Sequence, residues 1–194
     1  MNGYERRTQA KKKAIIDAAM ELFTRCGVSN VGVGEIAAQA HVSQVSIYNY
    51  FGDKHTLAKE VLVVILDKAI REYEEILERE IPFPEKLKIV MAKKHDAMIG
   101  ASRSHFSEYA WSDKVLQQVY WEAAAIKSAH IYLRFIELGK KEGAIDERIP
   151  NDAILKYLYS SISIMQEPDY LKTGDEYKLG IFRLFLYGLL GKEE

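Results

Sequence analysis

The residues best suited to chemistry in this 194-residue chain lie in one short stretch, HVSQVSIYNYFGDKHTL, at positions 41–57. Gln44 and Asn49 carry amides that can each donate and accept hydrogen bonds, as needed to read the N6 and N7 atoms of adenine. The hydroxyls of Tyr48 and Tyr50 have a reach suited to phosphate oxygens. This combination is typical of a surface that contacts double-stranded DNA.

Three neighbouring residues extend this set. Val45 can meet a thymine methyl group, and Ser46 can bond to a base or a phosphate. Lys54 adds a cation near the start of a following helix, where a phosphate is favoured. The predicted DNA-binding residues are therefore Gln44, Val45, Ser46, Tyr48, Asn49, Tyr50 and Lys54.

A helix over residues 44–51 would sort these side chains into two faces. At about 100° per residue, Ile47 and Phe51 lie together and Val45 and Asn49 fall opposite them. The first pair can pack onto apolar residues of the preceding helices, namely Leu22, Phe23, Ile36 and Ala37. The tyrosines flank the exposed face; taken alone, they would more often be half-buried rings with exposed hydroxyls.

Two helices must hold this segment in place. The apolar spacing predicts one from about residue 9 to residue 26, ended by Gly27, and a shorter one over residues 34–40. Ser43 is a good N-cap for the helix at 44–51. Two short helices joined by a tight turn, after a longer helix, make a helix-turn-helix arrangement at residues 1–53.

The remainder of the chain also has helical periodicity, so the predicted fold is all-α. A long helix, capped by Asp53, is expected to reach about Glu80, and the doublet Pro82 and Pro84 marks a boundary after it. Further helices are expected at 84–101, 104–111, 113–142, 151–166 and 175–190. The predicted organisation is a helix-turn-helix domain at 1–53, a connecting helix at 54–81 and a helical domain at 82–194.

The stretch EIAAQAHVSQVSIYNYFGDKHTL resembles the DNA-binding signature of TetR-type (tetracycline-repressor-like) transcriptional regulators. The resemblance covers roughly residues 10–60. Its matching elements are Ile36-Ala37, Val42-Ser43, Ile47-Tyr48, Tyr50-Phe51, Lys54 and Leu57, with Phe23 and Gly27 upstream. Two positions depart from the pattern: His41 replaces a glycine common in the turn, and Gly32 stands where a threonine often caps the second helix.

The resemblance implies a homodimer whose helical C-terminal domain binds a small molecule that lowers operator affinity. By motif position it implies that Gln44, Ser46, Tyr48, Tyr50 and Lys54 touch DNA. It gives no fixed role to Asn49, which only the helical wheel directs outward.

Composition and charge fit a soluble, cytoplasmic protein. Cys26 is the only cysteine, which fits a reducing compartment, and the N-terminus lacks the apolar run of a secretory signal. The apolar stretch LGIFRLFLYGLL is too short to span a bilayer and contains Arg183. The formal net charge is −1, yet residues 1–13 carry five basic side chains and one acid, a local patch that suits either a polyanion or a solvated tail.

Metal and catalytic sites are not expected. The five histidines and Cys26 form no close-spaced pair of the kind found in zinc sites. No glycine-rich phosphate loop, nucleophile elbow or distinctive carboxylate pair is present. The sequence predicts neither a metal nor a cofactor, and it predicts that the protein is not an enzyme.

The C-terminal half offers two further candidate surfaces. Aromatic residues gather around a helix break, which suggests a pocket for an apolar or aromatic effector, including a cationic one, near Met98, Phe106, Trp111 and Trp121; a solid core is the competing interpretation. Two apolar stripes suggest a homodimer interface that pairs helices across a two-fold axis. They consist of Leu155, Leu158, Tyr159 and Ile162, and of Phe182, Phe185, Leu186 and Leu189.

The favoured function is a homodimeric, ligand-responsive transcriptional regulator, most simply a repressor released from a pseudo-palindromic operator by a small molecule. Two other classes stay open at this point. A helical small-molecule-binding protein without a DNA role would show no salt-dependent affinity for DNA, and a helical-bundle enzyme would show turnover.

Overall fold

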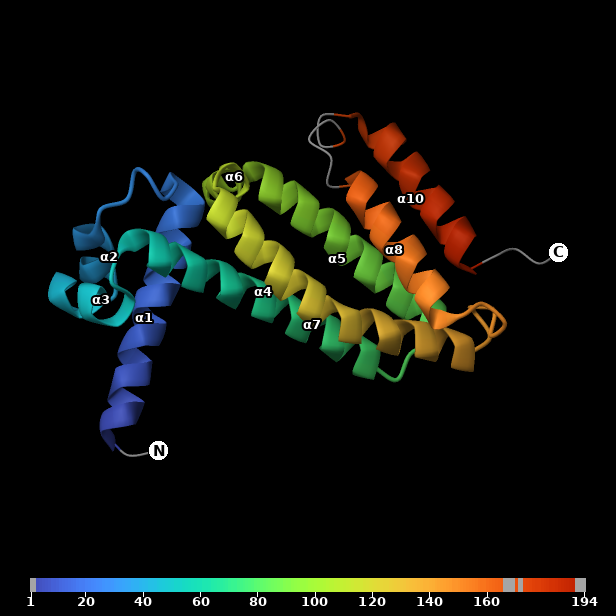
Figure 1. Ribbon diagram of the computed structural model, residues 1–194, viewed down its shortest axis with the longest axis horizontal. Coiled ribbons are helices and arrows are strands. Elements are labelled where there is room, and N and C mark those ends of the chain that lie inside the picture. The colour runs from blue at the N-terminus through green and yellow to red at the C-terminus, as the bar shows by residue number, and fades with distance from the viewer. Residues whose placement is uncertain (1–2, 166–169, 171–172, 191–194) are drawn as a thin grey trace. The chain divides into compact units, whose positions relative to one another are not determined.

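The computed structural model describes residues 3–165, 170 and 173–190, and for some helical positions within them, including Met98 and Ile162, the backbone alone. The described chain contains helices and no strand, so the predicted all-α fold is confirmed (Figure 1). The helices are α1 (Gly3–Cys26), α2 (Val33–Gln39), α3 (Gln44–Phe51), α4 (Lys54–Glu78), α5 (Phe83–Arg103), α6 (His105–Ser112), α7 (Lys114–Lys141), α8 (Asn151–Met165) and α10 (Asp175–Leu190). No helix among the described residues is long and apolar enough to cross a membrane.

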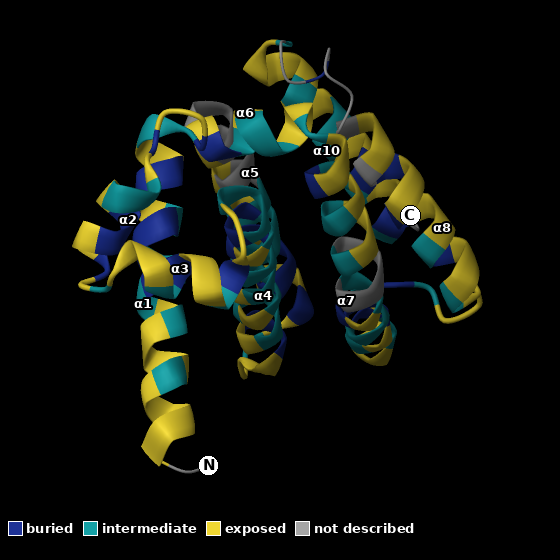
Figure 2. Ribbon diagram, turned by 60° about the vertical axis from the view of Figure 1, so that its left-hand side comes forward, coloured by how far each residue is buried: buried dark blue, intermediate teal, exposed yellow. Residues whose placement is uncertain are grey.

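Helix α1 begins six residues earlier than the predicted start at residue 9. Its buried residues all lie in its second half, from Ile15 to Phe23, and most of its first half is exposed (Figure 2). The first half therefore shows no apolar period, which is why its helical state was missed. An (i, i+4) ion pair between Lys13 and Asp17 supports the exposed part of the helix.

The chain forms two compact units that are discontinuous in sequence. Unit 1 comprises residues 1–71 and 95–126, and unit 2 comprises residues 72–94 and 127–194. The predicted division at residues 53 and 81 is linear, whereas α4, α5 and α7 each contribute to both units. A helix-turn-helix domain at 1–53 thus stays a prediction, and the compact unit that contains these residues is larger.

The core of unit 1 joins the N-terminal helices to α6 and the start of α7. Ile47 and Phe51 of α3 are buried in one cluster with the predicted residues of α1 and α2, and Phe106 and Leu116 belong to the same cluster. The rings of Phe23 and Phe106 stack with centroids 6.1 Å apart. The scaffold that holds α3 therefore extends beyond the first 60 residues.

Unit 2 packs its own aromatic core at the start of α5. The rings of Phe83 and Phe135 lie 4.5 Å apart, and the Phe83 N–H donates to the Glu142 carboxylate at 2.7 Å. Gly139 is required here, because a Cβ at this position would lie 2.6 Å from Ile145 Cδ1. The segment after α7 can thus approach the helix closely because residue 139 is a glycine.

A buried lysine closes the end of α4 in unit 2. Lys86 is buried, and its Nζ donates to the Leu77 carbonyl at 2.7 Å. Carbonyls in the last turn of a helix lack intrahelical partners and favour a cation. Lys86 therefore satisfies an orphan acceptor and places its charge at the favourable end of the helix.

Candidate DNA-binding site and its connections

The turn before α3 contains His41 in an unusual backbone conformation and ends with Ser43 as the N-cap. His41 has φ +54°, the left-handed conformation that favours glycine, and no other non-glycine residue in the described chain has a positive φ. Ser43 then caps α3, since its Oγ accepts from the Ser46 N–H at 3.2 Å. The predicted cap and the predicted bounds of α3 are both confirmed.

At the start of α2, a side chain of the first helical turn accepts from the N-cap backbone N–H. Gly32, which lacks a capping side chain, instead donates its N–H to the Glu35 carboxylate at 2.7 Å. An acidic side chain in the first helical turn is also favoured by the helix dipole. Glu35 thus takes over part of the role that a threonine at position 32 would have.

Helix α3 exposes the predicted polar face. Val45 and Tyr48 keep 65% and 50% of their surfaces exposed, and Gln44 and Asn49 are exposed as well. Ser46 is half-buried, with its Oγ 2.9 Å from the Ser43 Oγ. Side chains of this type, held on a short helix with a buried opposite face, can enter a major groove.

Tyr50 differs from Tyr48 in packing against the core. Its ring meets Phe51 edge-on at 6.4 Å and is half-buried. Lys12 Nζ lies over the same ring, 5.8 Å from its centroid. Tyr50 thus positions a cation of α1 beside α3. The sequence indicates a basic patch at residues 1–13 but does not single out Lys12 within it.

Lys54 is fixed by a hydrogen bond within unit 1. Its Nζ donates to the Val31 carbonyl at 2.9 Å, and the residue is half-buried. An ammonium has three donors, so two remain for a phosphate. The lysine therefore ties the start of α4 to the turn before α2 in addition to its predicted DNA contact.

The side chain of Gln44 lies close to α2. A Cβ at Gly34 would be 3.1 Å from Gln44 Nε2, a separation tighter than an ordinary van der Waals contact. Gly34 therefore leaves room for the amide that is predicted to read a base.

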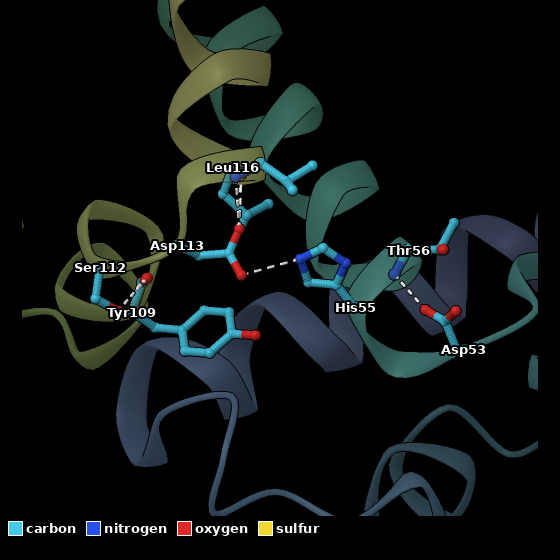
Figure 3. A network of polar contacts seen from close by, with 8 residues as sticks. Asp53, His55, Thr56, Tyr109, Ser112, Asp113 and Leu116 are labelled. Atoms are coloured by element: carbon cyan, nitrogen blue, oxygen red, sulfur yellow. Dashed lines mark hydrogen bonds and ion pairs between the residues drawn. The ribbon is translucent and has the colours of Figure 1, made fainter.

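A polar network joins the first turn of α4 to the junction of α6 and α7 (Figure 3). His55 Nε2 lies 3.1 Å from Asp113 Oδ2, while Asp113 Oδ1 accepts from the N–H groups of Val115 and Leu116, both at 2.9 Å. The Leu116 N–H and, secondarily, His55 hold the pKa of Asp113 below its usual range. Asp113 is thus the N-cap of α7 and an acceptor for α4 at once.

Asp53 caps α4 on the other side of His55. Its Oδ1 accepts from the Thr56 N–H at 2.6 Å, as its sequence position predicts. This bond is the main reason that the pKa of Asp53 is lowered. The start of α4 is therefore fixed by three side chains, those of Asp53, Lys54 and His55.

The predicted effector residues do not form one group. Phe106 is buried in the core of unit 1, whereas Trp111 and Trp121 are exposed by 43% and 45%. The ring centroids of the two tryptophans lie 6.2 Å apart. The ring centroid of Tyr120 lies 5.1 Å from that of Trp111 and 5.4 Å from that of Trp121. The Met98 side chain lies outside the described part of the structure.

The predicted dimer residues face in more than one direction. Leu158, Phe185 and Leu189 are buried within the chain, so they do not offer a surface to a partner as the predicted interface requires. Leu155, Phe182 and Leu186 are half-buried, Tyr159 is exposed, and the Ile162 side chain lies outside the described residues. Both helices are apolar on more than one face, so periodicity alone could not identify the outer one.

The outward faces of α8 and α10 carry other apolar residues. Leu184 and Tyr187 are 66% and 57% exposed, and Tyr157 and Ile164 are partly open as well. The two helices lie side by side (Figure 1), where the rings of Tyr157 and Phe185 stack at 5.9 Å. The Tyr157 hydroxyl fits against Gly188 and can donate to the Leu184 carbonyl at 3.3 Å.

Side chains that could bind a metal do not cluster among the described residues. Among the residues that the structure describes, no three His, Cys, Asp or Glu side chains are placed to hold a metal ion. Cys26 is a free thiol.

Residues 15–61 match the family described as bacterial regulatory proteins, tetR family. The HTH-type transcriptional repressor KstR2 of Rhodococcus jostii is 22% identical over 76% of this chain and 74% of its own length. The HTH-type transcriptional regulator RutR of Escherichia coli is 40% identical over 73 residues, 34% of each chain. Both relatives are named as transcriptional regulators.

Solved structures show the same fold over nearly the whole chain. A TetR-family regulator from Mesorhizobium loti matches with a TM-score of 0.72 at 18% identity, covering 94% of this chain and 98% of its own. SmeT, the repressor of a Stenotrophomonas maltophilia multidrug efflux pump, matches in its triclosan complex with a TM-score of 0.65 at 16% identity, covering 95% and 93%. Together with the exposed polar face of α3, these matches show a TetR-type DNA-binding region at residues 15–61, in a chain that has the fold of TetR-family regulators.

Proposed function

We propose that this regulator is a cytoplasmic repressor that binds a pseudo-palindromic operator as a homodimer and leaves it when a small effector binds. The observation that carries the proposal is the outward face of α3. Gln44, Val45, Tyr48 and Asn49 are exposed there, while Ile47 and Phe51 anchor the same helix in the core. The name of KstR2 as a repressor supports this sign of regulation.

The proposed DNA contacts are of two kinds, base recognition and phosphate binding. Gln44 and Asn49 can address base edges, while Lys54 and Lys12 can address phosphates on either side of α3. The Lys54 bond to Val31 and the Lys12 contact with Tyr50 place both cations before DNA arrives. Preplaced charges lose less side-chain freedom on binding than free ones do.

The proposed homodimer uses the outward faces of α8 and α10. Leu184 and Tyr187 expose more than half of their surfaces, which is unusual for large apolar side chains unless a partner covers them. Two-fold pairing of these faces would present two copies of α3 to two half-sites of one operator.

The proposed effector is apolar or aromatic in its main body. The triclosan complex of SmeT shows that a protein of this fold can hold such a molecule. In this chain, Trp111, Tyr120 and Trp121 form a cluster at the junction of α6 and α7 that could contact the effector.

The route from effector to DNA would pass through the start of α4. The His55–Asp113 contact and the Phe23–Phe106 stack join the scaffold of α3 to the α6–α7 junction within one compact unit. An effector that prefers a different position of this junction would shift the population toward a state with poorer operator fit.

Selection of bound duplexes from a random DNA pool tests the proposed function. We expect an enriched site with two-fold symmetry, and an affinity that falls steeply with salt because several phosphates are neutralised. Lys54→Met should weaken binding to all sequences alike and reduce the salt slope by about one, whereas the exposed Lys68→Met should leave both unchanged. Absence of any enriched sequence, or affinity that does not depend on salt, would refute the proposal.

A further inference from the structure

Lys94 is a cation that lies over an aromatic ring of unit 2. Its Nζ, from α5, lies 5.4 Å from the centroid of the Tyr132 ring of α7. Tyr132 in turn meets Tyr159 of α8 edge-on, with ring centroids 5.7 Å apart. Three helices that are distant in sequence thus bring one ammonium and two phenol rings together.

Three cations near Lys94 have carboxylate partners, whereas none is found for Lys94 among the described residues. Lys93 pairs with Glu72 at 2.6 Å, His130 lies 3.5 Å from Glu74, and Arg134 lies 3.8 Å from Glu78. Over the described residues, no carboxylate comes within ion-pair distance of Lys94 Nζ. The charge on Lys94 is therefore the uncompensated one in this group.

The surroundings of Lys94 disfavour its charge. Desolvation by the packed helices lowers the pKa of Lys94 from 10.5 to about 8. At neutral pH the ammonium is still mostly protonated, so the folded protein retains a half-buried charge that has no carboxylate partner among the described residues. The ring of Tyr132 offers a cation–π contact, which replaces only part of the lost hydration.

We propose that Lys94, Tyr132 and Tyr159 bind the anionic group of the effector, a single carboxylate or phosphate carried on an apolar body. The anion would supply a counter-charge to the ammonium, and the Tyr159 hydroxyl can donate a further hydrogen bond. Tyr159 is 39% exposed and Lys94 and Tyr132 are half-buried, so each of the three residues keeps some surface open to solvent. The inference rests on the proposed ligand-responsive function and narrows its effector; a cationic effector would be repelled by Lys94.

Matched acids and alcohols test the charge requirement. Decanoate, hexadecanoate and 2-naphthoate, the corresponding alcohols, and decyl phosphate are titrated by calorimetry into the full-length protein. We expect at least one anion to bind wild type roughly 10- to 100-fold more tightly than its alcohol, the ratio expected for a charge-assisted hydrogen bond. The carboxylate and phosphate members then show which anion is preferred.

Substitutions on α5 assign the effect to one residue. Lys94→Met should remove the preference for the acid and leave alcohol affinity within about twofold, because the apolar contacts remain. Lys88→Met, an exposed lysine on the same helix, should keep the full preference. A second readout is the pKa of the isotopically methylated Lys94 amine by NMR, which should rise when the anion binds.

The outcomes separate the site from the regulatory function. If no anion binds more tightly than its alcohol, or if Lys94→Met retains the preference, the anion site is refuted whatever the protein does on DNA. If the anion binds through Lys94 but does not release an operator selected from the random pool, the site stands and the proposed effector response fails.

Discussion

At the scale of single residues, neighbours on α3 divide the work between packing and recognition. Ile47 and Phe51 are buried, Tyr50 packs and positions Lys12, and Tyr48 is open to solvent. Tyr48 and Tyr50, two positions apart, thus have different environments in spite of identical chemistry. A variant at either position tests a different property, stability for Tyr50 and DNA affinity for Tyr48.

Gln44 is the residue whose effect should depend most on DNA sequence. Gln44→Ala should cost on the order of 1–3 kcal/mol at one base position and relax specificity there. Competition binding against operators with single-base changes measures this. A uniform loss over all operator variants would contradict a base-reading role.

Lys94 should make stability depend on pH in a defined window. The folded pKa of about 8 lies below the usual lysine value of 10.5, so between these pH values the unfolded chain binds a proton that the folded chain has released. The free energy of unfolding should therefore rise with pH in this window, by up to about 3 kcal/mol, and the penalty should be complete below it.

Comparison with Lys94→Met isolates this effect from other titrating groups. The variant should be more stable than wild type at pH 7, and the difference should shrink as pH rises to about 10.5. Urea unfolding at several pH values measures it, with Lys88→Met as the control. Parallel stability curves for wild type and Lys94→Met would show that Lys94 has no depressed pKa.

At the scale of elements, the turn between α2 and α3 carries measurable strain. His41 adopts φ +54°, a conformation that costs a residue with a side chain roughly 1–2 kcal/mol, while glycine pays only its larger entropy loss. His41→Gly should therefore stabilise the protein by about 0.5–1 kcal/mol, and His41→Val should destabilise it. Denaturant unfolding of the three proteins checks the order, and a glycine variant less stable than wild type would contradict it.

The link between α4 and the α6–α7 junction should appear in a double-mutant cycle. His55→Ala and Asp113→Ala should each destabilise, the second by about 1–2 kcal/mol because α7 also loses its N-cap. Their coupling energy should be about 0.5–1 kcal/mol, as for a partly exposed pair. Amide exchange in the first turn of α4 should accelerate in both variants. His105→Ala, at an exposed histidine of α6, is the control and should leave that exchange unchanged.

Sequence reasoning located elements where local chemistry marks their ends. The bounds of α3 were predicted because Ser43 supplies a cap and Gly52 a stop, both legible over a few residues. The start of α1 was missed because an exposed helix needs no apolar period. The outer faces of α8 and α10 were not predictable, since apolar residues surround both helices and only packing decides which are covered.

The same limit applied to the candidate sites. The DNA-facing set followed from a single helical wheel, and four of its members are exposed in the structure. Lys94 did not stand out, because its lack of a carboxylate partner depends on three helices separated by up to 65 residues. Phe106 was assigned to a pocket but belongs to the core of unit 1, a contact that spans 83 positions along the chain.

At the scale of the whole molecule, association should depend on the outward face of α10. Leu184→Glu should convert the protein to a monomer at micromolar concentration, because a charge would be buried in the proposed interface. Leu179→Glu, at an exposed leucine elsewhere on the same helix, should leave the mass unchanged. Light scattering measures both, and a monomeric wild type would refute the interface.

The discontinuity of unit 1 has a consequence for building hybrid regulators. A fragment cut after residue 60 would leave Phe23 without the ring of Phe106 and His55 without Asp113. Transplanting only that fragment onto the effector half of a relative would create a seam through a single hydrophobic core. A working chimaera should carry residues 95–126 along with the N-terminal helices, so that operator choice and the first part of signal reception are inherited together.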